Sequence, residues 1–276
     1  MADINLRNDD LSDRSEASSH EPEGKKRKRS EEDRPLSKRA AKRKKSKPKN
    51  DPLDEALDAE KGLNNAIGHM DSQLLADHIA QRNRRHQKDL STVEQEDLRI
   101  SASAIEETSD WREPRDLANL PGFLEEFAQR SHQTKRIDLK SAAKKEGSPH
   151  TLVVAGAGIR AADLTRALRQ FQTKDAKVEK LFAKHIKLKE AIETVKRTRT
   201  NIGVGTPQRI IDLLDDGALK SASLHRIVVD ASYIDTKKRG ILDMRETLVP
   251  LMNLLNRPEF RERYGAETGK LQLLFY

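Results

Sequence analysis

Two apolar strands joined through a short helix place the strongest constraint on the fold of this chain. The first strand is predicted over residues 201–204, and the Gly-Thr-Pro turn after it opens a helix at Pro207. Proline suits the first helical turn because its fixed φ matches the helix and its missing amide hydrogen is not needed there. The second strand, 226–230, ends in the carboxylate of Asp230. Alternation of this kind is typical of a parallel sheet.

The same alternation extends over residues 111–276. Three further apolar runs predict strands, so that five strands are expected, and helical spacing fills the segments between them. The additional strands are predicted at 151–155, 177–183 and 271–275, and the helices at 160–171, 186–199, 207–214 and 246–256, with another that begins at Leu120. We therefore expect residues 111–276 to form one α/β domain, with helices on both faces of a parallel sheet.

Residues 1–52 differ from this domain in composition. Hydrophobic residues make up only 35% of the chain and charged residues 36%, and residues 1–52 contain almost no large apolar side chains. Such a segment cannot bury enough surface to offset its chain entropy, so we expect it to be disordered.

The positive charge of the chain is concentrated in this tail. Residues 25–49 hold 14 Lys or Arg against three acidic residues, whereas the rest of the chain holds 39 basic and 42 acidic residues. Two dense basic clusters predict a bipartite nuclear address that also binds RNA phosphates, and a purely solubilising tail is the alternative. The clusters consist of Lys25, Lys26, Arg27, Lys28, Arg29, Lys38, Arg39, Lys42, Arg43, Lys44 and Lys45.

Residues 53–110 are predicted to form a helical connector or arm. Leu74, Leu75 and Ile79 fall at helical spacing, and Ser91 with Glu94 matches a helix capping box. The arm is expected to dock either on the core or on a partner protein. The sequence does not distinguish these two arrangements.

Several classes of protein are excluded or disfavoured by what the sequence lacks. It contains no cysteine, which excludes disulfides and thiolate metal sites and fits a reducing compartment. It contains no apolar run of the roughly 20 residues that span a bilayer, and its N-terminus does not read as a secretory signal. The histidines show no metal-binding spacing, and no phosphate loop of the G-x-x-x-x-G-K-[ST] type occurs. We therefore expect no metal, no cofactor and no membrane partner.

Three short motifs are candidates for a functional site. The first is the segment Asp230, Ala231, Ser232 and Tyr233, which stands where a helicase carries Asp-Glu-Ala-Asp. Alanine replaces the glutamate that would activate water, so we expect no catalytic base there. We expect Asp230 to cap the strand by accepting hydrogen bonds from backbone amides, and a metal ligand is the alternative.

The second candidate is Thr206, Pro207, Gln208 and Arg209, at the start of a predicted helix. The free amides of a helix N-terminus attract anions, and a hydroxyl and a guanidinium add donors for phosphate oxygens. We predict that this turn contacts the RNA backbone. The alternative is a helix cap followed by a surface arginine.

The third candidate is Gly156-Ala157-Gly158, which follows a strand and opens a helix, as in a loose dinucleotide-binding fingerprint. That fingerprint also needs an acidic residue at the end of the next strand. The next strand ends instead at Phe182-Ala183. Tight packing of a strand against a helix explains the glycines equally well.

Taken together, three segments resemble one eukaryotic family, the Cms1/CMSS-type family of DEAD-box-like proteins associated with the 90S pre-ribosomal particle. These segments are 180–187, 203–210 and 228–230, and weaker similarity extends over residues 70–276. The resemblance implies a single incomplete RecA-like domain without helicase activity in a nucleolar protein of small-subunit assembly. Gln208 replaces the usual glycine of the helicase motif, and Tyr276 lies where a helicase continues with Ser-Ala-Thr and a second domain.

The sequence thus predicts a non-catalytic ribosome-biogenesis factor in the nucleus and nucleolus, with pre-ribosomal RNA and small-subunit assembly factors as its partners and no small-molecule substrate. Two alternatives remain open. One is a divergent nucleotide-dependent enzyme, either a partner-dependent ATPase or an enzyme that uses Gly156-x-Gly158. The other is a purely protein-binding scaffold.

Overall fold

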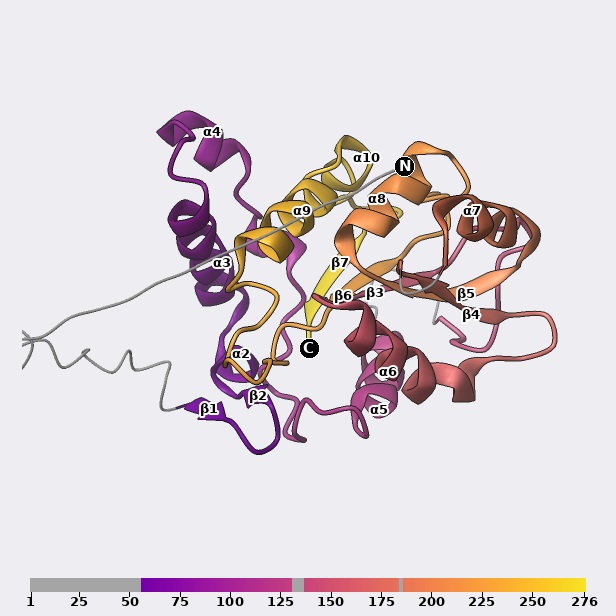
Figure 1. Cartoon of the computed structure of the whole chain (residues 1–276), viewed down its shortest axis with the longest axis horizontal. Helices are drawn as coiled ribbons and strands as arrows, with labels where there is room; N and C mark the ends of the chain where they lie inside the picture. The colour runs from indigo at the N-terminus through magenta and orange to yellow at the C-terminus, as the bar shows by residue number, and fades with distance from the viewer. Residues whose placement is uncertain (1–55, 131–136, 184–185) are drawn as a thin grey trace, which may run out of the picture. The chain divides into compact units, whose positions relative to one another are not determined.

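A five-stranded parallel sheet forms the centre of the computed structural model, which describes residues 56–130, 137–183 and 186–276 (Figure 1). The predicted tail with its basic clusters lies outside these residues. The strand order is β4-β5-β3-β6-β7, and every neighbouring pair is parallel. The strands are Thr151–Val154 (β3), Lys177–Leu181 (β4), Thr200–Gly205 (β5), Arg226–Val229 (β6) and Gln272–Phe275 (β7). All five predicted strands are present, and the predicted α/β fold class is confirmed.

The strand order brings the functional segments to one edge of the sheet. The chain starts at the central strand β3, moves outward to β4, returns through β5 and then crosses to β6 and β7. Val154 aligns with Gly205 on one side and with Val229 on the other, so the carboxyl ends of three strands lie together. Ligands of open α/β sheets bind at this edge. All three candidate motifs of the sequence follow these strand ends.

Helices from both halves of the described chain cover one face of the sheet. Leu152 and Val154 of β3 belong to a buried apolar cluster with Ile210 and Leu251 from two of these helices. The helices that contribute to the cluster include α3 (Ser72–His86), α7 (Leu188–Arg197), α8 (Pro207–Asp215), α9 (Arg245–Leu255) and the short α10 (Pro258–Arg261). Apolar residues recur on one side of each helix, and burial of that side fixes the helix on the sheet.

The opposite face carries α5 (Leu120–Gln129) and α6 (Gly158–Leu168). Val153 and Val228 point to this side because side chains alternate along a strand. Phe123 of α5 is fully buried and meets the ring of Tyr276 at a centroid distance of 4.7 Å. The sequence prediction of helices on both faces is therefore confirmed.

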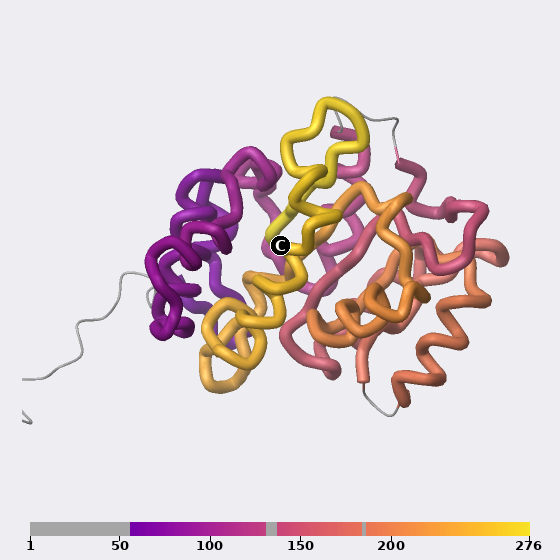
Figure 2. Tube along the Cα trace, turned by 90° about the horizontal axis from the view of Figure 1, so that it is seen from above, coloured from indigo at the N-terminus to yellow at the C-terminus, as the bar shows by residue number. Residues whose placement is uncertain are grey.

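The segment 56–104 packs on the core as a small subdomain. It contains β1 (Leu57–Asp58), β2 (Leu63–Asn64), α2 (Ala66–His69), α3, α4 (Thr92–Asp97) and the short 3₁₀ helix η2 (Ala102–Ala104). Figure 2 shows α3 beside the segment that contains α9, and the same contact is visible in Figure 1. Leu75 and Ile79 are 3% and 1% exposed within the cluster shared with α9. Each such burial contributes about 1.5–3 kcal/mol.

The antiparallel pair β1–β2 is a departure from the sequence prediction, which expects only helix between residues 53 and 110. Each strand has two residues, too few to show a period of two in the sequence. The capping box of α4 is present as predicted, with Ser91 and Glu94 bonded to each other's backbone amides. Among the described residues, no helix combines the length and the apolar composition needed to cross a membrane.

The carboxyl edge of the sheet is a candidate interaction site

Asp230 lies directly after β6 and forms a buried ion pair with Arg160 of α6. The guanidinium donates to both carboxylate oxygens, from Nε at 2.8 Å and from Nη2 at 2.9 Å, and the two side chains are 7% and 1% exposed. The guanidinium also stacks on the ring of Tyr233, 4.3 Å from its centroid. Burial acts to lower the pKa of Arg160, but the hydrogen bonds and charge of Asp230 outweigh it and raise that pKa.

This ion pair corrects the sequence interpretation of Asp230 as a strand cap bonded to backbone amides. Both carboxylate oxygens face a guanidinium from a helix 70 positions earlier in the chain. A bidentate arginine compensates the charge of a buried carboxylate through two charge-assisted hydrogen bonds, the role that a metal ion would otherwise fill. The expected metal-holding alternative would require Arg160 to leave a site that is nearly closed to solvent.

A backbone ladder covers the residues that follow Asp230. The amide of Asn64 donates to the carbonyl of Ser232 at 2.7 Å, and the amide of Ile234 donates to the carbonyl of Gly62 at 2.9 Å. Leu63 forms an antiparallel bridge with Tyr233. The segment predicted as a degenerate acidic box is therefore paired with β2 of the arm, and Ala231 and Ser232 are only 4% and 1% exposed.

The Thr-Pro turn at the end of β5 adopts the predicted backbone but not the predicted side-chain arrangement. Thr206 precedes α8 in an extended conformation, and its side chain makes no capping hydrogen bond. Arg209 is only 8% exposed, and its Nη1 donates to the carbonyl of Ile186 at 3.1 Å. Gln208 is exposed and donates to Asp212 at 2.8 Å. Arg209 is therefore not the surface side chain that either interpretation of the sequence assumes.

Two helix N-termini meet at a shallow depression beside this turn. Its volume is about 480 Å³, and it is lined by Gly158, Ile159, Ala183 and Thr206. Gly158 is the first residue of α6, and Pro207, next to Thr206, is the first residue of α8. Free amides and the positive ends of two helix dipoles therefore border one surface, where they favour an anion. Ile159 is 66% exposed there, which leaves an apolar side chain beside the polar amides.

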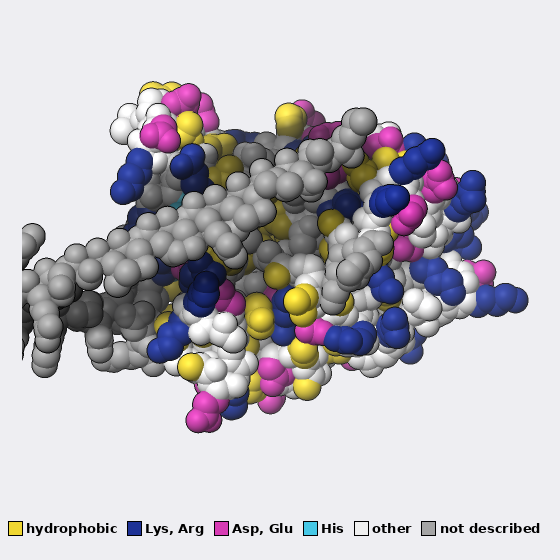
Figure 3. All heavy atoms as spheres, in the orientation of Figure 1, with side chains coloured by type: hydrophobic (Ala, Val, Ile, Leu, Met, Phe, Trp, Pro, Cys, Tyr) yellow, Lys and Arg dark blue, Asp and Glu magenta, His cyan; other side chains and the backbone are white. Residues whose placement is uncertain are grey.

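Lysines and arginines gather on β4 and α7, the elements on either side of the segment that holds Ala183. Figure 3 shows dark blue side chains concentrated at the end of the molecule where Figure 1 places α7 and β4. The exposed basic residues of β4, α7 and the residue before α7 are Lys180, Lys187, Lys189, Lys196 and Arg197. Lys196 is paired with Asp216 at 2.7 Å. These lysines and the arginine are exposed, so they can donate hydrogen bonds to a polyanion at the surface.

The Gly156-Ala157-Gly158 turn joins β3 to α6 close to the ion pair. A Cβ atom on Gly156 would lie 3.4 Å from Cβ of Ile241, so the strand-to-helix turn packs tightly against the segment before α9. β4 ends at Leu181, and no acidic residue follows it at Phe182 or Ala183. The described residues also hold no group of three or more His, Cys, Asp or Glu suited to a metal ion.

The structure also contains polar groups that the sequence analysis did not identify. Arg226 at the start of β6 is fully buried, and none of its three guanidinium nitrogens has a hydrogen-bond partner in the described part of the chain. Burial lowers the pKa of Arg226 to about 10. Burial, together with the charges of Arg226 and His225, lowers the pKa of His150 to about 4. An arginine at the beginning of an apolar strand normally reaches solvent, so the sequence gives no signal for this burial.

Comparison with known proteins identifies relatives over almost the entire chain. The family model described as "CMS1: U3-containing 90S pre-ribosomal complex subunit" matches residues 9–276. Protein CMS1 of Chaetomium thermophilum is 54% identical over 252 residues, which cover 91% of this chain and 96% of that protein. Human protein CMSS1 is 29% identical over 163 residues, 59% of this chain and 54% of its own length. A solved chain from a Saccharomyces cerevisiae Dbp5 complex aligns over 49% of this chain and 31% of its own length with a TM-score of 0.33 and 13% identity.

Proposed function

This chain belongs to the CMS1 family of U3-containing 90S pre-ribosomal complex subunits, as its sequence motifs indicate, and we propose that it serves ribosome biogenesis as a binding protein rather than as an enzyme. In this proposal the protein acts in the nucleus and nucleolus. It joins pre-ribosomal RNA to small-subunit assembly factors.

The proposal that the protein is not an enzyme is supported by the pairing and burial of Asp230. Its two oxygens are bonded to Arg160, and β2 covers the residues after it. A carboxylate that is 1% exposed and already paired offers no position for a metal-bound nucleotide. Removing Arg160 to open that position would leave a buried charge unpaired, which costs several kcal/mol.

The RNA-binding part rests on the depression between the N-termini of α6 and α8. The half-buried Thr206 lines the depression, and the exposed Gln208 is the second residue of α8, which begins beside it. Lys187 and Lys189 lie at the start of the neighbouring helix. Backbone amides, one amide side chain and nearby lysines form a donor set that suits sugar-phosphate contacts and carries no base specificity. We propose this surface, with Arg209 as a support behind it, as the contact to RNA.

A pair of matched substitutions tests the RNA contact in the full-length chain. Gln208 is the second residue of α8 and bonds Asp212, and Gln73 is the second residue of α3 and bonds Asp77 in the same way. A carboxylate at either position is compatible with the helix N-terminus. Gln208→Glu should weaken binding to structured RNA several-fold and lower the salt slope of the affinity by about 1, whereas Gln73→Glu should leave both unchanged.

Equal RNA affinity in the two variants would show that RNA does not contact this surface and would favour a core that binds proteins.

Catalysis is tested separately, by ATP hydrolysis of the full-length protein with and without RNA. We expect no hydrolysis above that of Asp230→Asn. RNA-stimulated hydrolysis that disappears in Asp230→Asn would refute the non-catalytic proposal.

A further inference from the structure

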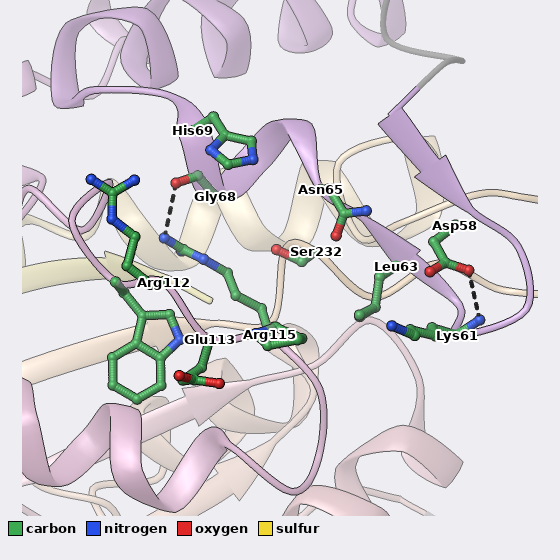
Figure 4. A pocket seen from close by; sticks show the side chains of 12 residues that line it. Asp58, Lys61, Leu63, Asn65, Gly68, His69, Arg112, Glu113, Arg115 and Ser232 are labelled. Atoms are coloured by element: carbon green, nitrogen blue, oxygen red, sulfur yellow. Dashed lines mark hydrogen bonds between the residues drawn. The ribbon is translucent and has the colours of Figure 1, made fainter.

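A second cavity lies between the arm and the loop before α5, away from the depression described above. Its volume is about 280 Å³, and Figure 4 shows the side chains that line it. One wall comes from the arm, through the turn that holds Lys61 and through α2. The opposite wall comes from residues 111–115, and Ser232 closes the space from the end of β6. Arm, loop and sheet thus build the cavity together.

Two hydrogen-bond donors of this cavity have no acceptor among the residues that the structure describes. Ser232 is 1% exposed, and its hydroxyl oxygen has no hydrogen-bond partner. The indole nitrogen Nε1 of Trp111 is also buried and without a partner. In Figure 4 the Ser232 hydroxyl lies on the side of the Arg115 guanidinium. Buried polar groups are nearly always hydrogen-bonded, so two unpaired donors around one cavity indicate that an acceptor is supplied from outside.

Arg115 contributes positive charge to the cavity, although its guanidinium N–H groups are already hydrogen-bonded to backbone carbonyls. It donates to the carbonyls of Phe275, Gly68 and Thr108 and is 6% exposed. Lys61 and Arg112 add two exposed cations, whereas Asp58 and Glu113 are the two acidic residues of the lining. The interior of the cavity therefore favours an acceptor with negative charge.

We propose that this cavity binds the carboxylate of an acidic side chain, Asp or Glu, within a peptide segment of a partner protein. The carboxylate accepts hydrogen bonds from the Ser232 hydroxyl and the Trp111 indole, and Arg112 and Arg115 supply the charge. In this proposal Asp58 and Glu113 accept hydrogen bonds from backbone amides of the peptide on either side of its acidic residue. The same two residues would repel the successive phosphates of RNA, which makes a peptide the better fit.

The size of the cavity agrees with a single side chain. Sites for complete small molecules usually measure about 300–1,000 Å³, and this cavity lies just below that range. This contact is separate from the proposed RNA surface, so either can fail without the other.

Trp111 is the only tryptophan of the chain and gives the experiment a local probe. The ¹⁵N-labelled full-length protein is titrated with a blocked Gly-Gly-Glu-Gly-Gly peptide, and the single indole N–H signal is followed by NMR. We expect a saturable downfield shift. The neutral peptide Gly-Gly-Gln-Gly-Gly should bind about tenfold more weakly, because a hydrogen bond to a charged acceptor is stronger.

Two variants and one control locate the binding. Ser232→Ala removes a hydroxyl that has no partner among residues 56–130, 137–183 and 186–276, so it breaks no hydrogen bond within them, and it should weaken binding of the Glu peptide about tenfold. Arg112→Gln changes an exposed residue and should also weaken binding. Arg166→Gln, on the exposed side of α6, should have no effect.

Three results would overturn the proposal. The first is equal binding of the Glu and Gln peptides, and the second is the absence of a saturable shift. The third is tighter binding of oligouridylate or ATP at the same indole signal, which would assign the cavity to nucleotides instead.

Discussion

At the scale of single residues, the Arg160–Asp230 pair predicts a strong energetic coupling. Both charges are buried, so removal of one partner leaves the other without compensation and should cost about 3–5 kcal/mol. In urea unfolding of Arg160→Met, Asp230→Asn and the double variant, we expect the double variant to lose at least about 1 kcal/mol less than the sum of the single losses. The exposed pair Arg166–Asp163 serves as control, with a coupling below about 1 kcal/mol. Additive losses at the buried pair would contradict the prediction.

Arg226 leads to the opposite prediction, because it is a buried charge without a partner. Within the described residues none of its guanidinium nitrogens is hydrogen-bonded, and Glu106 acts on its pKa only through charge. Arg226→Met keeps most of the side-chain volume and removes the charge, so it should raise the free energy of unfolding by about 1–3 kcal/mol. Arg226→Lys keeps the charge and should give no gain. A loss of stability in Arg226→Met, measured by the urea midpoint, would show that a bound ion or water satisfies the guanidinium.

At the scale of elements, the pairing of β2 with the segment after β6 depends on Gly62. Gly62 has φ of +65°, and a Cβ there would lie 3.3 Å from the carbonyl oxygen of Ile234. Gly217 has φ of +77° and nothing within 4 Å, so it is the matched control. Alanine at either position should cost about 1 kcal/mol for the backbone conformation. Only Gly62→Ala should also weaken the ladder and speed amide exchange at Asn64 and Ile234. Equal exchange in both variants would contradict this role of Gly62.

The elements of the sheet were predictable because each gives a signal within its own stretch of sequence. Apolar runs bounded by Gly or Pro mark β3 and β5, and Pro207 marks the start of α8. The pair β1–β2 has too few residues to give such a signal. It forms because the chain beyond β6 supplies a partner for Leu63, a contact that only the folded chain creates.

The site was predictable only in part, for the same reason. The carboxyl edge of the sheet and the turn at Thr206 follow from local pattern. The pairing of Asp230 with Arg160 and the hydrogen bond from Arg209 to the carbonyl of Ile186 join residues that are not neighbours in the sequence. No sequence periodicity or motif indicates such contacts, so the sequence alone does not predict that these polar side chains are buried.

At the scale of the whole molecule, stability is expected to fall in mild acid because histidines are buried in the neutral form. Burial and the charges of Arg226 and His225 lower the pKa of His150 to about 4, and burial lowers the pKa of His225 as well. The unfolded chain binds a proton near pH 6.5, whereas the folded chain resists protonation until the pH nears 4. The stabilisation is therefore complete above about pH 6.5 and is lost as the pH falls from there toward 4.

The measurement is the free energy of unfolding of the full-length protein at pH 7.5 and at pH 5.0. His150 alone should account for about 2 kcal/mol of the loss between these values, since one pKa unit corresponds to about 1.4 kcal/mol. His150→Gln loses the hydrogen bond between Nδ1 and the Thr151 hydroxyl, whose atoms lie 2.8 Å apart. The variant should therefore be less stable than the wild type at pH 7.5. It should then lose less than the wild type on acidification. The exposed His69→Gln should follow the wild-type profile. If His150→Gln and the wild type lose the same amount, His150 is protonated in the folded protein at pH 5.0, and its burial beside Arg226 does not keep it neutral.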